Sequence, residues 1–315
     1  MLGCISDQAQ VGSLLQIIVK VFCDIVGHND LAYSVLALFN RVGGSVSFPN
    51  KDQDWHKHLH TDSITSPDLA GARFITLEEF KGTSFDVYVS TCYLTEHWVA
   101  DQAKGKGLFI RQINNLLEQP EVAGNVLMGV RHNIDTSLNR FDYIPEHPPR
   151  YKPNTNIRKE YAVLTFSEYQ ANHPAGGKIW DAACQELSPA LKSDRVPEQS
   201  LHELFWKSQS YAHIKATGGC GFTLREAMFS GLPVLVDTSW SHIYKTPAKD
   251  YLVDQVNCID IAATNRTRQQ SAQLLKEWIT GNDCNERNKN ALTKTKQLIN
   301  FEQEASDFKS WLLAL

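Results

Sequence analysis

The stretch that decides the fold is "GGCGFTLREAMFSGLPVLVD", residues 218–237. It begins with glycines, continues through a segment that reads as a helix, and ends with an apolar run that is typical of a buried strand. A glycine-rich turn that opens a helix leaves unpaired backbone N–H groups at the helix start, which favour phosphate. Tight turns between packed elements have the same pattern, so the rest of the chain must decide between the two interpretations.

Apolar, strand-like runs alternate with helical segments along the whole chain. The expected strands are residues 14–24, 45–49, 85–91, 107–113, 161–167, 211–216 and 233–237. The expected helices are residues 31–44, 96–106, 178–187, 200–208 and 223–231, followed by a tail that is helical over residues 266–315. Because parallel strands are joined by crossovers that are usually helices, the alternation predicts an α/β fold with parallel sheets.

A proline-rich segment, residues 142–159, interrupts this alternation. It carries four prolines and several basic residues and has no apolar period, which is typical of a connection between domains. We therefore expect an N-terminal domain over residues 1–148, a second domain over residues 149–300, and a C-terminal helix over residues 301–315 that packs back toward the first domain. In open α/β sheets ligands bind outside the carboxyl ends of the strands, so a ligand is expected between the two halves.

The composition argues against several classes of protein. The 315 residues carry a formal net charge of −4, which argues against broad electrostatic binding to nucleic acid or acidic membranes. The seven cysteines are scattered without a Cys-x-x-Cys pair, which is typical of reduced thiols in a reducing compartment. No apolar run reaches the length of a membrane span, and the N-terminus does not resemble a signal peptide. We expect a cytoplasmic protein, or one that acts in a host cytoplasm if it is viral.

Glu226 follows the glycine turn in the expected helix, in or near its first turn. From that position its carboxylate could accept hydrogen bonds from the hydroxyls of a ribose, while the glycines let the backbone approach a phosphate closely. The alternative is a surface acid that compensates the helix dipole beside an ordinary turn. In the strand "YAHIKA", His213 and Lys215 alternate with Ile214 and are expected on one face, next to the glycine turn. A core histidine is the alternative interpretation of His213.

The stretch resembles the signature E-G-F-G-x-x-x-x-E-A-x-x-x-G-x-P-V of retaining family 4 GT-B glycosyltransferases. The residues in register are Gly219, Gly221, Glu226, Ala227, Gly231, Pro233 and Val234. Residues 132–141, 176–183 and 202–216 are similar to further ordered elements of that class. The resemblance implies the GT-B fold, with two Rossmann-like domains whose parallel sheets face a central cleft. It also implies transfer of a hexose from a nucleotide diphosphate sugar, with a UDP-sugar as the expected donor, retention of configuration, and neither a metal nor another cofactor.

The resemblance also implies roles for individual residues. Glu226 would bind the ribose, Lys178 at a strand-to-helix loop would offset the charge of the diphosphate, and Gly27 would leave room for the reacting sugar. The backbone at the glycine turn and nearby side chains would hold the rest of the donor. These donor-binding residues are His213, Lys215, Gly218, Gly219, Cys220, Gly221, Phe222, Thr223, Arg225 and Glu226. A solvated surface lysine is the alternative interpretation of Lys178.

Two positions of the second half depart from the family pattern. Gly218 stands where the signature has its first acid, and Glu168 stands where the family has an arginine after the first strand of the second domain. A catalytically silent relative that binds a sugar nucleotide or a partner is therefore one alternative, and a sugar-nucleotide epimerase or hydrolase is another. The acceptor stays open between a nucleic-acid base, as in phage enzymes that glucosylate modified DNA bases, a glycan and a small molecule. The oligomeric state is open as well.

Polar side chains elsewhere suggest weaker sites. His56, His58 and His60 have a period of two and would share one face of a strand, where they could bind zinc, but an exposed loop is the preferred interpretation and no metal site is expected. In the first half, candidate acceptor contacts follow the expected strands. These candidates are His28, Thr91, Tyr93 and His97, whereas Arg111 and Gln112 end the expected strand 107–113, near where the family that the chain resembles often carries a histidine.

Overall fold

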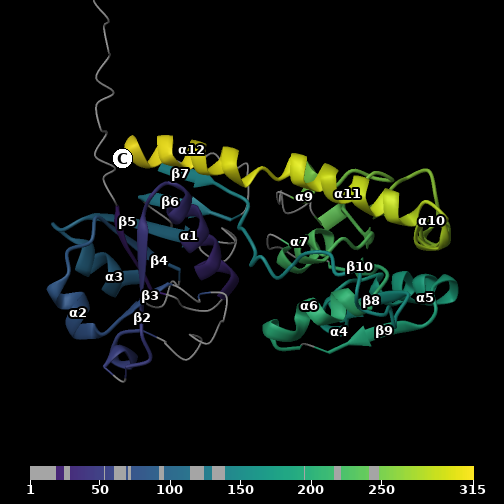
Figure 1. Cartoon of the computed structure of the whole chain (residues 1–315), viewed down its shortest axis with the longest axis horizontal. Helices are drawn as coiled ribbons and strands as arrows, with labels where there is room; N and C mark the ends of the chain where they lie inside the picture. Colours follow the sequence, from purple (N-terminus) through teal and green to yellow (C-terminus); the bar gives the residue numbers. More distant parts are fainter. Residues whose placement is uncertain are drawn as a thin grey trace, which may run out of the picture.

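Two parallel β-sheets, each covered by helices, make up the fold (Figure 1). The computed structural model describes residues 19–24, 29–52, 54–59, 69, 72–91, 96–113, 124–129, 139–194, 196–215, 221–240 and 248–315. The first sheet has seven strands and the second has five, and every pair of neighbouring strands that is described runs parallel. The α/β class with two parallel sheets that the alternation predicted is thereby confirmed.

The first sheet has the strand order β3-β2-β1-β4-β5-β6-β7. Its strands are β1 (Lys20–Cys23), β2 (Ser45–Pro49), β3 (Arg73–Ile75), β4 (Val87–Ser90), β5 (Leu108–Ile113), β6 (Asn125–Met128) and β7 (Asn139–Asp142). The helices of this half are α1 (Asn29–Arg41), the 3-10 turn η1 (Trp55–Lys57), α2 (Leu77–Gly82) and α3 (Glu96–Ala103). The inner strands are apolar on both faces because helices cover both, as in other parallel sheets.

The second sheet has the strand order β12-β11-β10-β8-β9. Its strands are β8 (Val163–Phe166), β9 (Ala190–Ser193), β10 (Tyr211–His213), β11 (Val234–Val236) and β12 (Ile259–Asp260). Its helices are α4 (Ser167–Ala171), α5 (Gly176–Glu186), α6 (Glu198–Lys207), α7 (Phe222–Phe229), α9 (Ala248–Tyr251), α10 (Arg268–Thr280) and α11 (Cys284–Leu298). The stretch that opened the sequence analysis therefore forms α7 and β11.

Successive residues of a strand in the second sheet point to opposite faces, and the two faces have different covers. On one face Tyr211 and Val234 pack against α6, α7 and α9. On the other face Ala212 and Leu235 pack against α5 and α10. Side chains at the carboxyl ends of these strands can therefore reach one of two separate helical layers.

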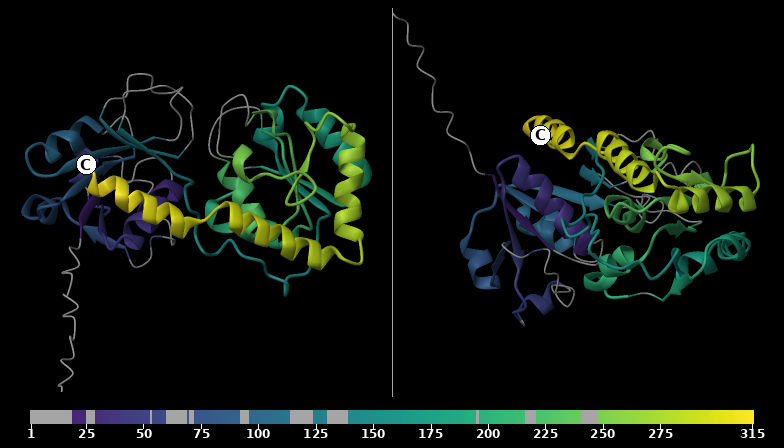
Figure 2. Two further views of the ribbon diagram at one scale, coloured as in Figure 1. Left: turned by 90° about the horizontal axis from the view of Figure 1, so that it is seen from above. Right: turned by 45° about the vertical axis from the view of Figure 1, so that its right-hand side comes forward.

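A tail of three helices ends the described chain and connects the two halves (Figure 2). After α10 and α11 beside the second sheet, α12 (Phe301–Leu313) crosses to the first half and packs against α1. Phe308 of α12 meets Phe39 of α1 edge-on with ring centroids 5.0 Å apart, and both are buried. Arg41 of α1 is bonded to both Glu302 of α12 and Glu146 of the proline-rich segment. The two chain crossings between the halves are thus tied together.

No helix in the described ranges is both long enough and apolar enough to cross a membrane.

Candidate functional site

The glycine turn leads into α7 through a left-handed residue. Gly221 caps the helix with φ 68° and ψ 45°, a conformation that favours glycine, and no side chain caps the helix start. A Cβ at this position would lie 3.5 Å from both the Trp240 ring and the Tyr251 hydroxyl. Gly218, Gly219 and Cys220, as well as Gly27 and His28 of the first half, lie outside the described residues. The helix begins at Phe222, one residue before the predicted range of 223–231.

Glu226 lies deeper in the helix than the sequence suggested. The first turn of α7 contains no acidic residue, and Glu226 is the fifth helical residue, with 1% of its surface exposed. The alternative interpretation, a surface acid that compensates the helix dipole, was wrong, because α7 is buried on almost every side and draws this position into the core. Its carboxylate therefore lies in the interior and not on a solvent face.

Arg225 is the most unusual side chain of this region. It is fully buried, and none of its three guanidinium nitrogens has a hydrogen-bond partner among the residues that the structure describes. Its guanidinium carbon lies 5.0 Å from the centre of the Phe222 ring, one turn back toward the start of α7. Helical side chains lean toward the N-terminus of their helix, so the charge is carried to the end where the glycine turn joins. A buried, unpaired cation is costly and calls for a counter-ion.

His147, from the proline-rich segment, lies beside Arg225. Burial, and after it the positive charge of Arg225, lower the pKa of His147 to about 3. Its Nδ1 lies 3.3 Å from the carbonyl of Pro148, and its ring contacts the Phe229 ring at the far end of α7 at 4.3 Å. The histidine is therefore neutral at physiological pH. Sequence reasoning missed His147, because a histidine inside a proline-rich connection reads as exposed.

His213, at the end of β10, is almost fully buried on the α7 face of the second sheet. Its Nδ1 lies 3.3 Å from the Tyr211 hydroxyl, and its ring centre lies 5.9 Å from that of Trp240. Burial and then the charge of Lys215 lower the pKa of His213 to about 3. The strand ends at His213, so Lys215 lies beyond it and is half-buried. The position of His213 agrees with the alternative interpretation, a histidine packed in the core.

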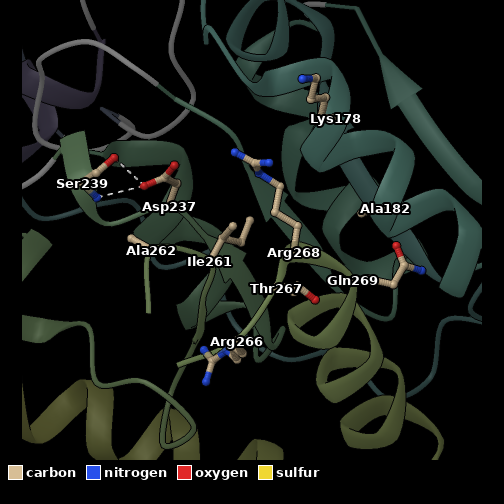
Figure 3. Close-up of a pocket in the computed structure, with 10 residues that line it drawn as sticks. All are labelled: Lys178, Ala182, Asp237, Ser239, Ile261, Ala262, Arg266, Thr267, Arg268 and Gln269. Carbon is tan, nitrogen blue, oxygen red and sulfur yellow. Dashed lines mark hydrogen bonds between the residues drawn. The ribbon is translucent and has the colours of Figure 1, made fainter. Parts of the chain in front are cut away.

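Lys178 lines a separate pocket at the other face of the same sheet (Figure 3). It is the third residue of α5 and not part of a loop directly after the strand, because the short helix α4, which contains Glu168, follows β8 at once. The pocket has a volume of about 680 Å³. The residues that line it are Lys178, Ala182, Asp237, Ser239, Ile261, Ala262, Arg266, Thr267, Arg268 and Gln269. Arg268 and Arg266 were missed by the sequence analysis, because nothing in the sequence tells which strand end they adjoin.

A histidine–aspartate pair joins α5 to the end of β11 at this pocket. The Nε2 atom of His173 lies 3.2 Å from Asp237, and both side chains are mostly buried. The Nδ1 atom of His173 accepts a hydrogen bond of 3.0 Å from the Ala175 amide, so Nε2 carries the proton that faces Asp237. The other oxygen of Asp237 accepts from the Ser239 amide at 2.9 Å. The pair fixes the start of α5, and with it Lys178, relative to the sheet.

The sequence-predicted donor residues therefore fall into two groups. Arg225, Glu226 and His213 lie on the α7 face of the second sheet, whereas Lys178 lies on the face covered by α5 and α10. Both groups are at the carboxyl ends of strands, because α7 begins after β10 and α5 begins after β8 and α4. They can meet only over that edge of the sheet, which is where α/β folds bind ligands.

The candidate acceptor contacts of the first half are mostly engaged in local structure. Thr91 donates from its amide at 2.7 Å and from its hydroxyl at 2.8 Å to Asp24, which is fully buried at the end of β1. The guanidinium of Arg111 pairs with Glu96 at 2.7 Å. Gln112 donates to the Tyr143 hydroxyl at 3.3 Å and is buried, His97 is exposed, and Tyr93 lies outside the described residues.

The histidine triplet does not form a strand. His56 is part of the 3-10 turn η1, and His58 follows it and stacks on the Trp98 ring with centroids 5.0 Å apart. His60 lies outside the described residues. Within the part of the chain that the structure describes, no group of three His, Cys, Asp or Glu side chains comes close enough together to hold a metal ion.

Comparisons with known proteins give the fold. No protein-family model and no curated protein sequence matches the chain. Among solved structures, sucrose-phosphate synthase from Thermosynechococcus elongatus is similar with a TM-score of 0.59 and 10% identity, over 94% of this chain and 98% of that one. The catalytic domain of starch synthase IV from Arabidopsis thaliana, bound to ADP and acarbose, gives a TM-score of 0.57 with 8% identity over 94% and 99%.

AviGT4, a glycosyltransferase involved in avilamycin A biosynthesis, gives a TM-score of 0.52 with 13% identity over 93% of this chain and 96% of that one. At such identities the likeness establishes architecture, and it covers nearly the full length of each neighbour. The chain has the GT-B fold, as shown by its seven-stranded and five-stranded parallel sheets together with its similarity to these solved structures.

Proposed function

We propose that the chain is a glycosyltransferase that moves a hexose from a nucleotide diphosphate sugar to an acceptor, with retention of configuration and without a bound metal. The GT-B fold supports glycosyl transfer in general. The glycine turn that opens α7 and the family signature around it support a nucleotide sugar as the donor, with a UDP-sugar as the first choice.

The observation that carries the proposal is the buried guanidinium of Arg225. It has no hydrogen-bond partner among the described residues, and it lies at the start of the helix that follows the glycine turn. A diphosphate would supply the missing counter-charge and several acceptor oxygens at once. Charge-assisted bonds of this kind are strong in a site that excludes water, and arginine fits phosphate with two parallel N–H groups.

The remaining donor contacts follow from the same placement. Glu226 would accept hydrogen bonds from the ribose, and the backbone of Gly219, Cys220 and Gly221 would approach the phosphates, with Phe222 and Thr223 opening the helix beside them. Gly218 would leave space for the donor sugar. Lys178 and Lys215 would add positive charge from the strand ends on either side. Gly27, which the sequence places between the first strand and the first helix of the other half, would leave room for the reacting sugar.

The reaction would then depend mainly on electrostatics and positioning. When the bond between sugar and diphosphate breaks, negative charge grows on the leaving phosphate oxygens, and cations that already face that position stabilise the transition state more than the ground state. Holding the donor and the acceptor in one orientation supplies a further part of the rate.

For the acceptor we propose a modified DNA base, as in phage-type glucosyltransferases, among the three classes named above. The support comes from the exposed basic residues Lys152 and Arg158 of the proline-rich segment. Two further basic residues there have local partners. The Lys159 ammonium donates to the Ser208 carbonyl at 2.9 Å, and Arg150 lies 4.8 Å over the Tyr151 ring.

The test is to incubate the full chain with UDP-, GDP- and ADP-hexoses, first alone and then with glucosylatable DNA, glycans or small alcohols. A transferase consumes the donor only with an acceptor, a hydrolase or epimerase consumes it alone, and a silent relative binds it without turnover. Glu226→Gln, which keeps the buried volume, is expected to weaken donor binding in a thermal-shift assay, with Glu286→Gln on α11 as the charge-matched control. Failure of every nucleotide sugar to bind would reject the proposal.

A further inference from the structure

The pocket beside Lys178 brings together three connections of the second half. It is lined by the start of α5, by residues that follow β11, and by the segment from the end of β12 into α10. Its volume of about 680 Å³ is within the usual range for small-molecule sites. It lies at the carboxyl ends of β11 and β12, on the face away from α7.

Positive charge in this pocket exceeds negative charge. Three of the lining residues are cations, Lys178, Arg266 and Arg268, and one is an acid, Asp237. Arg266 is compensated by Asp254, outside the lining, and Asp237 is held by the Ser239 amide and by His173. Asp237 keeps its negative charge, but the lining still carries more positive than negative charge, and Lys178 and Arg268 are the lining cations without an ion pair among the described residues.

Lys178 and Arg268 come from different helices and face the same space. Both side chains are exposed, and neither forms an ion pair or a side-chain hydrogen bond with any residue in the described ranges. Figure 3 shows the guanidinium of Arg268 extended toward the side where Lys178 and Asp237 lie, while Arg266 points away from them. Two like charges that converge on one pocket repel each other, so an anion between them lowers the energy of both.

We infer that this pocket binds a phosphate group, held by Arg268 from α10 and by Lys178 from α5. The planar fork of an arginine binds two phosphate oxygens at once, and a lysine acts as a point charge. The start of α5 adds to this, because its cap residue Ala175 offers no side-chain acceptor. The Gly176 amide is bonded to the His173 carbonyl at 2.9 Å, so the amides left for a ligand are those that follow it in the first turn. In α10, by contrast, the capping box of Thr267 and Gln270 already occupies such groups.

The phosphate can have two origins. The assignment to the donor's own diphosphate rests on the proposed function, in which the donor lies over this edge of the sheet. The other origin is a separate phosphorylated molecule that binds beside the donor. A phosphate group from either origin would bind Arg268 in the same way. The experiment therefore has one arm that tests whether the site binds phosphate and a second arm that tests which molecule carries the phosphate.

The first arm titrates inorganic pyrophosphate into the full chain by calorimetry at constant ionic strength. Wild type is expected to bind, and Arg268→Gln is expected to weaken binding roughly ten- to a hundredfold, the usual effect of removing charge-assisted bonds. Arg268→Lys keeps the charge without the fork and should lose less. Arg73→Gln, an exposed arginine on β3 of the other sheet, is the matched control and should bind as wild type does.

Two results would overturn the inference: no binding of pyrophosphate by wild type, or unchanged affinity in Arg268→Gln with a native circular dichroism spectrum. The second arm repeats the titration with a saturating nucleoside diphosphate present. If the nucleoside diphosphate competes with pyrophosphate in wild type but not in Arg268→Gln, the result supports the donor's diphosphate as the ligand. If pyrophosphate binds in an Arg268-dependent way while the nucleotide is bound, the result supports a separate phosphorylated ligand. Pyrophosphate contains neither sugar nor base, so its binding does not depend on the proposed function. If the chain binds pyrophosphate through Arg268 but turns over no sugar nucleotide, the phosphate site is supported and the proposed function is rejected.

Discussion

Two arginines of the second half, Arg266 and Arg225, are both buried, but their surroundings are opposite. The guanidinium of Arg266 donates to both oxygens of Asp254, to the Asp260 carbonyl at 2.6 Å and to the Ser271 hydroxyl at 3.0 Å. The guanidinium of Arg225 donates to none of the described residues and lies 5.0 Å from the Phe222 ring, with the neutral His147 beside it. The same type of side chain is therefore fully hydrogen-bonded within the fold at position 266 and a charge without a hydrogen-bond partner among the described residues at position 225.

This difference indicates which of the two arginines the fold itself requires. Burial alone would raise the pKa of Asp254, but the hydrogen bonds from Arg266 and from the Asp260 amide keep it below its usual value, so this pair is charged and mutually satisfied. An unpaired buried charge destabilises a protein, and a fold gains nothing by keeping one. The Arg225 region therefore carries a cost that a ligand can offset, and the Arg266 region does not.

The largest expected effect is at the satisfied site. Arg266→Leu should lower the free energy of unfolding by about 3–5 kcal/mol, because it leaves Asp254 without its partner in a partly buried position. Urea denaturation followed by circular dichroism measures this. The double variant Arg266→Leu with Asp254→Leu should recover part of the loss, and a single variant as stable as wild type would break the comparison.

Acidification should act on the Arg225 region first. Folded His147 has a pKa of about 3, against 6.5 for an ordinary histidine, so between these values the unfolded state binds a proton that the folded state does not. Stability then falls as the pH is lowered below 6.5, by about 1.4 kcal/mol per pH unit, or roughly 2 kcal/mol at pH 5.

His213 adds a loss of the same sign, since its folded pKa is also about 3. The lowered pKa of Asp254 acts only below 3.8, so the Arg266 region should not respond in this window. Urea titrations at pH 7, 6 and 5 on wild type and His147→Gln test this. An equal pH dependence in both proteins would contradict the assignment of His147.

Removing the unbonded charge of Arg225 should change the free energy of unfolding in the opposite direction to removing the bonded charge of Arg266. Arg225→Met keeps an unbranched buried side chain and should raise the free energy of unfolding of the ligand-free protein by about 1–2 kcal/mol. The same variant should lose most of the thermal stabilisation that a nucleotide sugar gives to wild type. Calorimetric scans with and without donor measure both. A destabilised Arg225→Met would mean that Arg225 is bonded in solution, for example through buried water.

The smallest effect is expected at the turn that leads to Arg225. Gly221→Ala should cost about 1 kcal/mol, because φ 68° disfavours any residue with a Cβ while the space around it is sufficient. Gly177→Ala, in the first turn of α5 where a Cβ meets nothing within 4 Å, is the control and should be neutral or slightly stabilising. Thermal unfolding distinguishes the two, and equal effects would mean that the turn stores no strain.

The fold was largely predictable because buried parallel strands are apolar on both faces. The runs around Val163–Phe166, Tyr211–His213 and Val234–Val236 indicated β8, β10 and β11 directly, and the glycines around α7 marked both ends of that helix. The sequence did not reveal how deeply individual side chains are buried. Glu226 and Arg225 stand in a short segment that mixes charged and apolar residues, and only the packing of α7 against α6, α11 and β11 shows that they are buried.

The candidate site was less predictable, because parallel crossovers bring together residues that are far apart in the chain. Lys178 was found from its place before an apolar helix, but its counterpart Arg268 begins a helix that is separated from it by two strands of the sheet order. His173 and Asp237 likewise belong to different connections and meet only in three dimensions. A pattern along the sequence can mark a strand end, but it cannot tell which other strand end lies beside it.

The return of α12 to the first half has a consequence for biosynthesis. Ala305 and Phe308 close the core around Phe39 of α1, so the half that leaves the ribosome first lacks part of its interior until the whole second half has been translated. During that interval the surface of α1 that Phe308 later covers stays open to water and to other nascent chains. Folding of the N-terminal half is therefore completed late, and a ribosome-bound intermediate with an exposed α1 is the species on which a chaperone would act.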